Sequence, residues 1–265
     1  MFSCLTWPSR EFRFQPTFRD NEYFNVGVCH DDDDRVDEDC CAVQLQFLGE
    51  EATAFFGFYE GHRSGWTVAR AASLYLHELL ATEIYSRERP VDIKDCFEKA
   101  FSKLDESVKN NAYDRGACAT TCMIREYKDR TMLHFANIGD TRAILSREGK
   151  SFRLTYNHTH RDEEEAARLA ACRAYIKSNP RVRRLVTQTR AFGDHAFKKW
   201  VISTPYYNEI LLTQDDTWLL LLSNNICQTL DDQDAVNIAE GENLACQYIH
   251  YSIMMNAERT SPRPH

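Results

Sequence analysis

The sequence lacks an excess of positive charge. Its 32 Lys and Arg residues are outnumbered by 40 Asp and Glu residues, and the formal net charge is −8. A protein that binds nucleic acid or an anionic membrane needs a basic face to neutralise phosphate groups. The composition therefore argues against both classes of partner, and we expect no nucleic acid and no membrane among them.

A long apolar run is also missing. The longest strongly apolar stretch, WLLLL at Trp218–Leu222, is far too short to cross a bilayer and is typical of a buried strand. The first residues, MFSCLTWPSREFRF, lack the basic start and the apolar core of a signal peptide. We therefore expect neither a targeting segment nor a membrane span.

No C-x-x-C motif occurs among the ten cysteines. Cys40 and Cys41 are adjacent, and Cys118 and Cys122 are four positions apart, so the spacings fit no zinc template. Disulfide frameworks are typical of short secreted chains, whereas this chain has 265 residues and no visible signal peptide. We expect reduced, buried cysteines and a location in the cytoplasm or the nucleus.

No repeat, low-complexity segment or long linker divides the chain, and we interpret residues 1–265 as one domain. Stretches rich in β-formers predict strands, namely CCAVQLQFLG, ATAFFGFY, ACATTCMIRE, TMLHFANIG, TRAILS, RLVTQTRAF, KKWVIST, NEILL and TWLLLLS. Helical periodicity predicts four helices. The first starts at Trp66, the second runs from Ile93 to near Asn110–Asn111, and a short third helix lies around Glu163–Arg173. The fourth closes the chain over Asp234–Met255, with an interruption at Gly241. Strands in blocks with helices grouped between them favour an α+β fold, with helices packed outside antiparallel sheets.

Five stretches resemble, in order, the motifs of one family, the metal-dependent protein phosphatases of the protein phosphatase 2C (PPM) type. FFGFYEGHRSG resembles FFxVYDGHGG, and GACATTCMI resembles a GSTA strand. FANIGDTRAILSREGKSFRLTYNHT resembles ANVGDSRAVL…G…LTxDH, and LVTQTRAFGDHAFK resembles LAVSRAFGDxxxK. WLLLLSNNICQTLDDQDAV resembles FLILASDGLWDVLSxQEAV. The match spans about residues 27–240, and five ordered motifs are far more specific than any one of them.

The resemblance implies a β-sandwich of two antiparallel sheets flanked by pairs of α-helices, in four layers αββα. It also implies carboxylates at one end of the sandwich that hold two Mg²⁺ or Mn²⁺ ions. Such ions lower the pKa of a shared water, which attacks the phosphorus of a phosphoserine or phosphothreonine.

Several metal-binding positions implied by the resemblance carry altered residues. Glu60 stands where the family has an Asp that bridges both ions, while Gly61 keeps the position of a backbone carbonyl ligand. Because Mg²⁺ tolerates little departure from octahedral geometry, the longer Glu side chain is expected to weaken the site. Asn224 and Gln228 replace two further Asp residues, and each change removes one negative charge. The family's last ligand is an Asp before a final strand, and we predict that both that strand and its Asp are missing.

The N-terminal acidic stretch allows two interpretations. By resemblance, Arg35 is a phosphate contact and Glu38 and Asp39 form the family's metal-associated acidic pair, although their spacing is one residue tighter than usual. A solvated acidic loop explains Asp31–Asp34 better.

Other motif residues also have two interpretations. His62 keeps the position of the family's general acid, or serves as a hydrogen-bonding residue in a tight turn. Asp140 matches a position that binds an additional metal ion, or caps a turn between two strands. Asp194 is interpreted as structural, and Thr155 and His158 as core hydrogen-bonding residues.

The altered ligands favour a degenerate member of the family, a pseudophosphatase that acts as a binding, adaptor or regulatory protein in phosphorylation signalling. Its expected partner is a protein, such as a kinase or a phosphoprotein, and its expected cofactor is none or weakly bound Mg²⁺ or Mn²⁺. The alternative is a divergent active serine/threonine phosphatase that uses Glu60, Asp140 and the Glu38–Asp39 pair around one or two Mn²⁺ ions. A small-molecule sensor is a third class, for which no apolar pocket motif argues.

Overall fold

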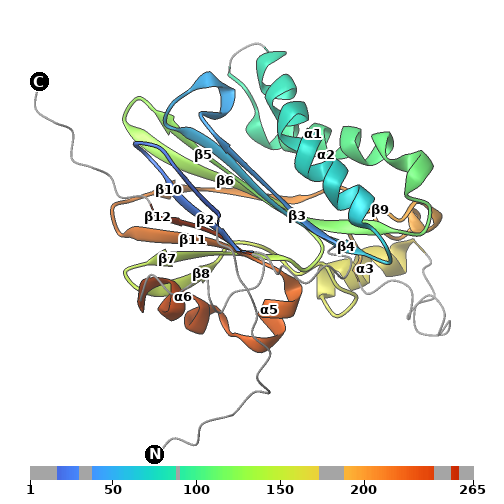
Figure 1. Ribbon diagram of the computed structural model, residues 1–265. Coiled ribbons are helices and arrows are strands. Elements are labelled where there is room, and N and C mark those ends of the chain that lie inside the picture. Colours follow the sequence, from blue (N-terminus) through green and yellow to red (C-terminus); the bar gives the residue numbers. More distant parts are fainter. Residues whose placement is uncertain (1–16, 30–37, 88–89, 173–187, 242–251, 257–265) are drawn as a thin grey trace, which may run out of the picture.

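The computed structural model of the protein describes residues 17–29, 38–87, 90–172, 188–241 and 252–256. Two antiparallel sheets face each other, and helices cover the outer face of each sheet (Figure 1). The layers therefore run helix, sheet, sheet, helix. This arrangement confirms the predicted α+β sandwich.

The first sheet has the strand order β10-β6-β5-β4-β3, with the short β9 paired to β5. Its strands are β3 (Asp39–Leu45), β4 (Thr53–His62), β5 (Gly116–Tyr127), β6 (Arg130–Ile138), β9 (Phe192–Gly193) and β10 (Tyr206–Leu212). The helices α1 (Trp66–Tyr85) and α2 (Ile93–Ser107) lie side by side on its outer face (Figure 1).

The second sheet has the strand order β1-β2-β12-β11-β7-β8. Its strands are β1 (Thr17–Asp20), β2 (Asn25–Cys29), β7 (Arg142–Arg147), β8 (Lys150–Arg153), β11 (Asp216–Leu222) and β12 (Ser252–Asn256). The remaining α-helices are α3 (Glu163–Ala171), α5 (Asn224–Thr229) and α6 (Asp232–Gly241), of which α6 packs on the outer face of this sheet (Figure 1). Short 3-10 helices span Phe47–Gly49, Lys109–Asn111 and His195–Phe197.

Strand β4 lies inside the first sheet, between β3 and β5, and its sequence is almost entirely apolar up to Tyr59. Successive side chains of a strand point to opposite faces of the sheet. Phe55 and Tyr59 pack in the core beneath α1 and α2, whereas Phe56 and Phe58 pack in the core between the two sheets. Both faces of β4 are therefore buried, and no polar alternation is required.

Helix α2 forms as its periodicity predicts. Its apolar side chains, such as Phe97 and Phe101, are buried against the first sheet. The side chain of Asp92 caps the helix by accepting a hydrogen bond from the backbone N–H of Asp95 at 3.1 Å.

In the described ranges, no helix is both long enough and apolar enough to cross a membrane.

The prediction for the C-terminal end is wrong in two respects. Helix α6 ends at Gly241, where the interruption was predicted, but Ser252–Asn256 form a strand rather than the last turns of a helix. The C-terminal strand that we expected to be missing is therefore present as β12, between β2 and β11. Backbone groups of those two strands need partners inside the sheet, and this requirement outweighs the helical pattern. The residues between Asp234 and β12 contain no Asp.

The stretch KKWVIST, also predicted as a strand, contains only one bridge, between Ile202 and Arg190. The backbone N–H groups of Trp200 and Val201 instead donate hydrogen bonds to the carbonyl of Phe197, at 2.7 and 2.8 Å. These hydrogen bonds form a turn, so the segment is not a strand, although its residues favour strands.

Candidate functional site

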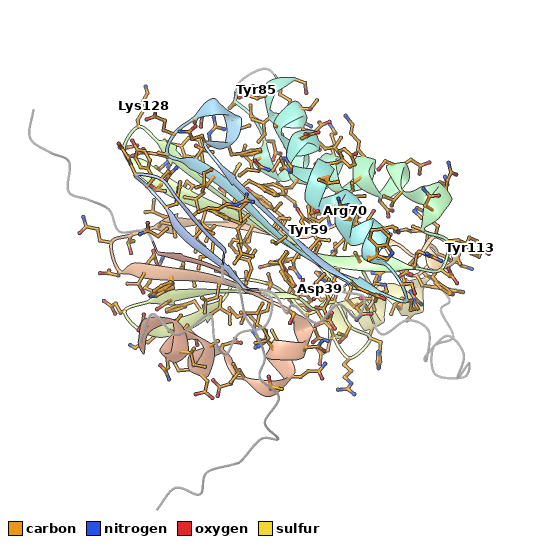
Figure 2. All side chains as sticks on the ribbon, viewed as in Figure 1. Asp39, Tyr59, Arg70, Tyr85, Tyr113 and Lys128 are labelled. Atoms are coloured by element: carbon orange, nitrogen blue, oxygen red, sulfur yellow. The ribbon has the colours of Figure 1, made fainter. Side chains whose placement is uncertain are left out.

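The candidate site lies at the end of the sandwich where β3 and β4 approach the start of α5. Asp39 pairs with Glu60 across the two strands, and Figure 2 labels Asp39 at this end. The backbone N–H of Asn224, the first residue of α5, donates a hydrogen bond to Oε2 of Glu60 at 2.8 Å. Burial raises the pKa of Glu60 to about 7, against the lowering effect of that hydrogen bond. The nearby Asp140 raises it further.

Asp140 lies in the tight turn between β6 and β7, and only 9% of it is exposed. Its carboxylate accepts hydrogen bonds from the side-chain amide of Gln188, at 3.3 and 3.4 Å, and from the thiol of Cys118, at 3.5 Å. The pKa of the Cys118 thiol is raised well above its ordinary value, mainly by burial and to a smaller extent by the negative charges of Asp140 and Glu60. The thiol therefore stays protonated and remains a donor to Asp140.

Glu38 is held by the turn that leads into α1. Its Oε1 accepts the backbone N–H of Ser64 at 2.9 Å, and its Oε2 accepts that of Gly65 at 3.4 Å. Arg63 and Ser64 have φ angles of 55° and 63°, the left-handed conformation that turns these N–H groups toward one carboxylate. The Glu38 carboxylate thus satisfies donors at the start of a long helix, where negative charge is stabilising.

His62 is fixed by Asp194, which has only 2% of its surface exposed. Nε2 of His62 lies 2.9 Å from Oδ2 of Asp194, and the guanidinium of Arg63 donates to Oδ1 of the same carboxylate. A Cβ at Gly116 would come within 2.8 Å of His62 Nε2 and 2.9 Å of Asp194 Oδ2. A glycine is therefore required beside this pair.

The structure brings together some of the predicted site residues and separates others. Asp39, Glu60, Gly61, His62, Asp140 and Asn224 come from neighbouring strand ends and turns and from the first residue of α5. Gln228 lies one turn further along α5 and is exposed. Glu38 is close in sequence to this group, but its carboxylate is engaged by the turn before α1. Arg35 falls outside the described residues, so its predicted contact with phosphate is untested.

Three acidic side chains of this region, Glu38, Glu60 and Asp140, already take part in hydrogen bonds. No group of three or more His, Cys, Asp or Glu residues in the described ranges is arranged to hold a metal ion. Glu60 accepts a hydrogen bond from the backbone N–H of Asn224, and Asp140 accepts one from the side-chain amide of Gln188. Glu38 accepts hydrogen bonds from two backbone N–H groups. Asn224 and Gln228, at the positions of two expected carboxylates, carry no charge.

Sequence reasoning missed two residues of this region and did not predict the partners of a third. Gln188 and Arg63 lie beside motif residues and had no recognisable pattern of their own. Asp194 was interpreted as structural, and the structure shows how it acts, by holding both His62 and Arg63. The Asp at the end of the RAFGD motif was the available signal, but nothing in the sequence pairs it with a residue 132 positions earlier.

The sequence model of the protein phosphatase 2C family matches residues 30–256. The chain therefore belongs to the protein phosphatase 2C family, whose members normally use Mg²⁺ or Mn²⁺. It is 27% identical over 232 residues to protein phosphatase 2C homolog 1 of Saccharomyces cerevisiae, a match that covers 81% of this chain and 82% of the yeast protein. It is also 29% identical over 206 residues to the probable protein phosphatase 2C 2 of Arabidopsis thaliana, covering 76% of this chain and 53% of the plant protein. The chain thus spans about half the length of this plant relative.

Solved structures agree with the fold. A serine-threonine phosphatase 2C from Toxoplasma gondii superposes with a TM-score of 0.70 at 16% identity, covering 93% of this chain and 98% of that one. A C. elegans sex determining protein superposes with a TM-score of 0.69 at 16% identity, covering 95% of this chain and 66% of that one. At this level of identity the superpositions establish the protein phosphatase 2C-like fold alone.

Proposed function

We propose that this protein is a pseudophosphatase, a protein phosphatase 2C-like scaffold that binds a protein partner in phosphorylation signalling and does not hydrolyse phosphoesters. Its partner is a kinase or a phosphoprotein, in the cytoplasm or the nucleus. The observation that carries the proposal is that two acidic side chains of the site already accept structural hydrogen bonds. Glu38 and Glu60 accept hydrogen bonds from backbone N–H groups that hold the α1 turn and α5 in place.

The charge balance supports the same function. Two dications need several negative ligands to offset their mutual repulsion, and the number of charged ligands is a main determinant of affinity. Asn224 and Gln228 carry no negative charge, and no Asp lies between Asp234 and β12. Bound Mg²⁺ or Mn²⁺ is therefore expected to be weak or absent.

The first test is a calorimetric titration of the purified chain with Mn²⁺, with a metal-binding member of the family titrated in parallel. The expected result is no two-site binding up to millimolar Mn²⁺ and no turnover of a phosphothreonine peptide. Tight binding at two sites, followed by metal-dependent turnover that is lost in Glu60→Ala, would overturn the proposal in favour of a divergent active phosphatase.

A further inference from the structure

Helix α1 is apolar on two opposite faces. Its inner face packs on the first sheet, yet the helix also contributes four of the eight exposed large hydrophobic side chains in the described residues. These four are Trp66, Leu74, Tyr75 and Tyr85, with 45%, 46%, 52% and 66% of their surface exposed. The neighbouring α2 contributes none. Several exposed large apolar side chains on one helix are typical of an interaction surface.

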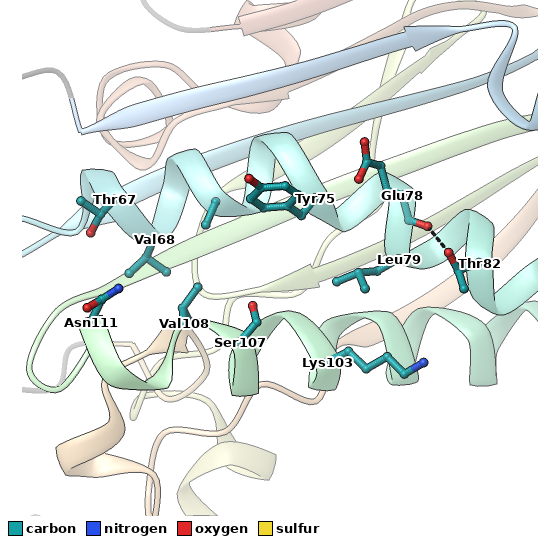
Figure 3. Close-up of a pocket in the computed structure, with 11 residues that line it drawn as sticks. Thr67, Val68, Tyr75, Glu78, Leu79, Thr82, Lys103, Ser107, Val108 and Asn111 are labelled. Carbon is teal, nitrogen blue, oxygen red and sulfur yellow. Dashed lines mark hydrogen bonds between the residues drawn. The ribbon is translucent and has the colours of Figure 1, made fainter.

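The outer face of α1 has one charged residue on each side of Leu74. Arg70, Leu74 and Glu78 are spaced four residues apart, so they form a continuous ridge along the helix. Both charged side chains are exposed, and neither forms an ion pair with any residue that the structure describes. Arg70 is labelled in Figure 2 and Glu78 in Figure 3. We call Arg70, Leu74 and Glu78 the α1 ridge.

The α1 ridge is complementary to itself. Arg70 and Glu78 lie four residues before and after Leu74, about 6 Å along the helix axis in each direction. When a second copy of the ridge runs antiparallel to the first, each Arg meets a Glu, and Leu74 meets its own counterpart. A parallel arrangement would instead place like charges opposite each other.

We propose that the outer face of α1 is a dimerisation surface for a second copy of this chain, with the twofold axis at Leu74. Arg70 then faces Glu78 of the second copy, and the symmetry of the interface repeats the same pair on the other side of the axis. Packing of two ridges with a four-residue repeat is the commonest class of helix contact, and long Arg and Glu side chains adapt to its crossing angle.

A groove beside the ridge increases the area that a second copy can cover. α1 and α2 enclose a space of about 490 Å³, lined by residues that include Tyr75, Leu79, Ser107 and Val108 (Figure 3). A stable interface buries roughly 800 Å² on each partner, which is more than one ridge provides. A helix laid across α1 extends over this groove and adds the contact of exposed Tyr75. The proposal is independent of the metal-binding site and of the proposed function.

The test is sedimentation equilibrium of the full chain, as wild type and as the variants Arg70→Glu, Glu78→Arg and Arg70→Glu/Glu78→Arg. The wild type is expected to dimerise. Each single charge reversal places like charges together twice, and we expect it to raise the dimer Kd by at least about tenfold. The double reversal restores both pairs, and its Kd is expected to return to within about threefold of wild type.

Lys94→Glu is the matched control, because it makes the same change in net charge as Arg70→Glu at an exposed position of α2. It is expected to leave the Kd unchanged. Leu74→Glu, which places two carboxylates at the axis, is an independent disruption should a charge reversal fail to fold by circular dichroism. A wild type that stays monomeric to its solubility limit overturns the proposal. A Kd that is insensitive to Arg70→Glu, or a double reversal that fails to restore dimerisation, also overturns it.

Discussion

The backbone N–H of Asn224 donates to the Glu60 carboxylate across 164 residues of sequence, and the bond joins the two sheets of the sandwich. Glu60 ends the apolar run of β4 in the first sheet, whereas Asn224 starts α5 directly after β11 of the second sheet. A carboxylate at the position of a family metal ligand thus has a structural partner in this chain. Removal of the Glu60 carboxylate is therefore expected to lower the stability of the fold.

Glu60→Ala is expected to destabilise the protein and Glu60→Gln to preserve most of its stability. The alanine leaves the Asn224 N–H without its acceptor at a half-buried position, which costs about 1–2 kcal/mol of unfolding free energy. The amide oxygen of glutamine still accepts the hydrogen bond. Urea unfolding of the two variants measures the difference, with Glu126→Ala on the exposed part of β5 as the control. Equal stability of Glu60→Ala and Glu60→Gln would show that this hydrogen bond contributes nothing.

Restoring charge to α5 should create a dependence on metal. The double variant Asn224→Asp/Gln228→Asp adds one carboxylate beside Glu60 and a second one turn further along α5, and like charges at short range destabilise one another. We expect its Tm to fall in the presence of a chelator, and to recover with Mn²⁺, which offsets the repulsion. Turnover of a phosphopeptide is still expected to be absent, because no Asp lies between Asp234 and β12.

Asn225→Asp is the control for that experiment, since it adds a charge at an exposed position of the same helix. Its Tm should change little and should not respond to Mn²⁺. If the double variant is as stable as the wild type and equally indifferent to Mn²⁺, these two positions do not adjoin a potential metal site.

Glu38→Ala should loosen the turn before α1. The two backbone N–H groups that its carboxylate accepts belong to Ser64 and Gly65, and the removal of such a cap costs about 1 kcal/mol. Hydrogen exchange is expected to speed up at these two amides and in the first turn of α1, while the centre of the helix is unaffected. Glu51→Ala, at an exposed position in the loop before β4, is the control. Unchanged exchange at Ser64 in Glu38→Ala would contradict this capping role.

The strands of the sandwich core were predictable from sequence because their side chains must be buried. If either face of β4 were exposed, two of the aromatic side chains Phe55, Phe56, Phe58 and Tyr59 would face water. Both faces must therefore be covered, as they are in a sandwich of two sheets with outer helices. β12 was not predictable in the same way. Its five residues carry too short a pattern to distinguish strand from helix, and its place between β2 and β11 is decided by pairing with strands far away in the sequence.

The candidate site shows the same limit. The motifs located Glu60, His62, Asp140 and Asn224 in the sequence, because these residues lie in short stretches that resemble the motifs of the family. The partners of those residues were not predictable, since each hydrogen bond joins positions far apart in the chain. Glu38 is the clearest example, because its sequence position suggested a metal ligand and its geometry makes it a cap for α1.

The buried His158 should make the protein sensitive to mild acid. Burial lowers the pKa of His158 to about 4, from an ordinary value of 6.5, and its side chain is not exposed. The folded state therefore favours the neutral ring, so the stability it contributes is complete above pH 6.5 and is lost as the pH falls toward 4. Between pH 7 and pH 5 this single group accounts for a loss of about 2 kcal/mol of unfolding free energy.

His158→Gln removes this contribution and keeps a donor for the carbonyl of Gly139, which the His158 ring contacts at 3.2 Å. Urea unfolding at pH 7 and at pH 5 is expected to show a smaller loss in this variant than in the wild type, by about 2 kcal/mol. Part of the acid sensitivity will remain, because burial also lowers the pKa of His134 to about 4. His160→Gln, at a half-exposed position two residues away, should retain the wild-type loss. If His158→Gln loses as much stability as the wild type between the two pH values, protonation of His158 does not contribute to acid unfolding.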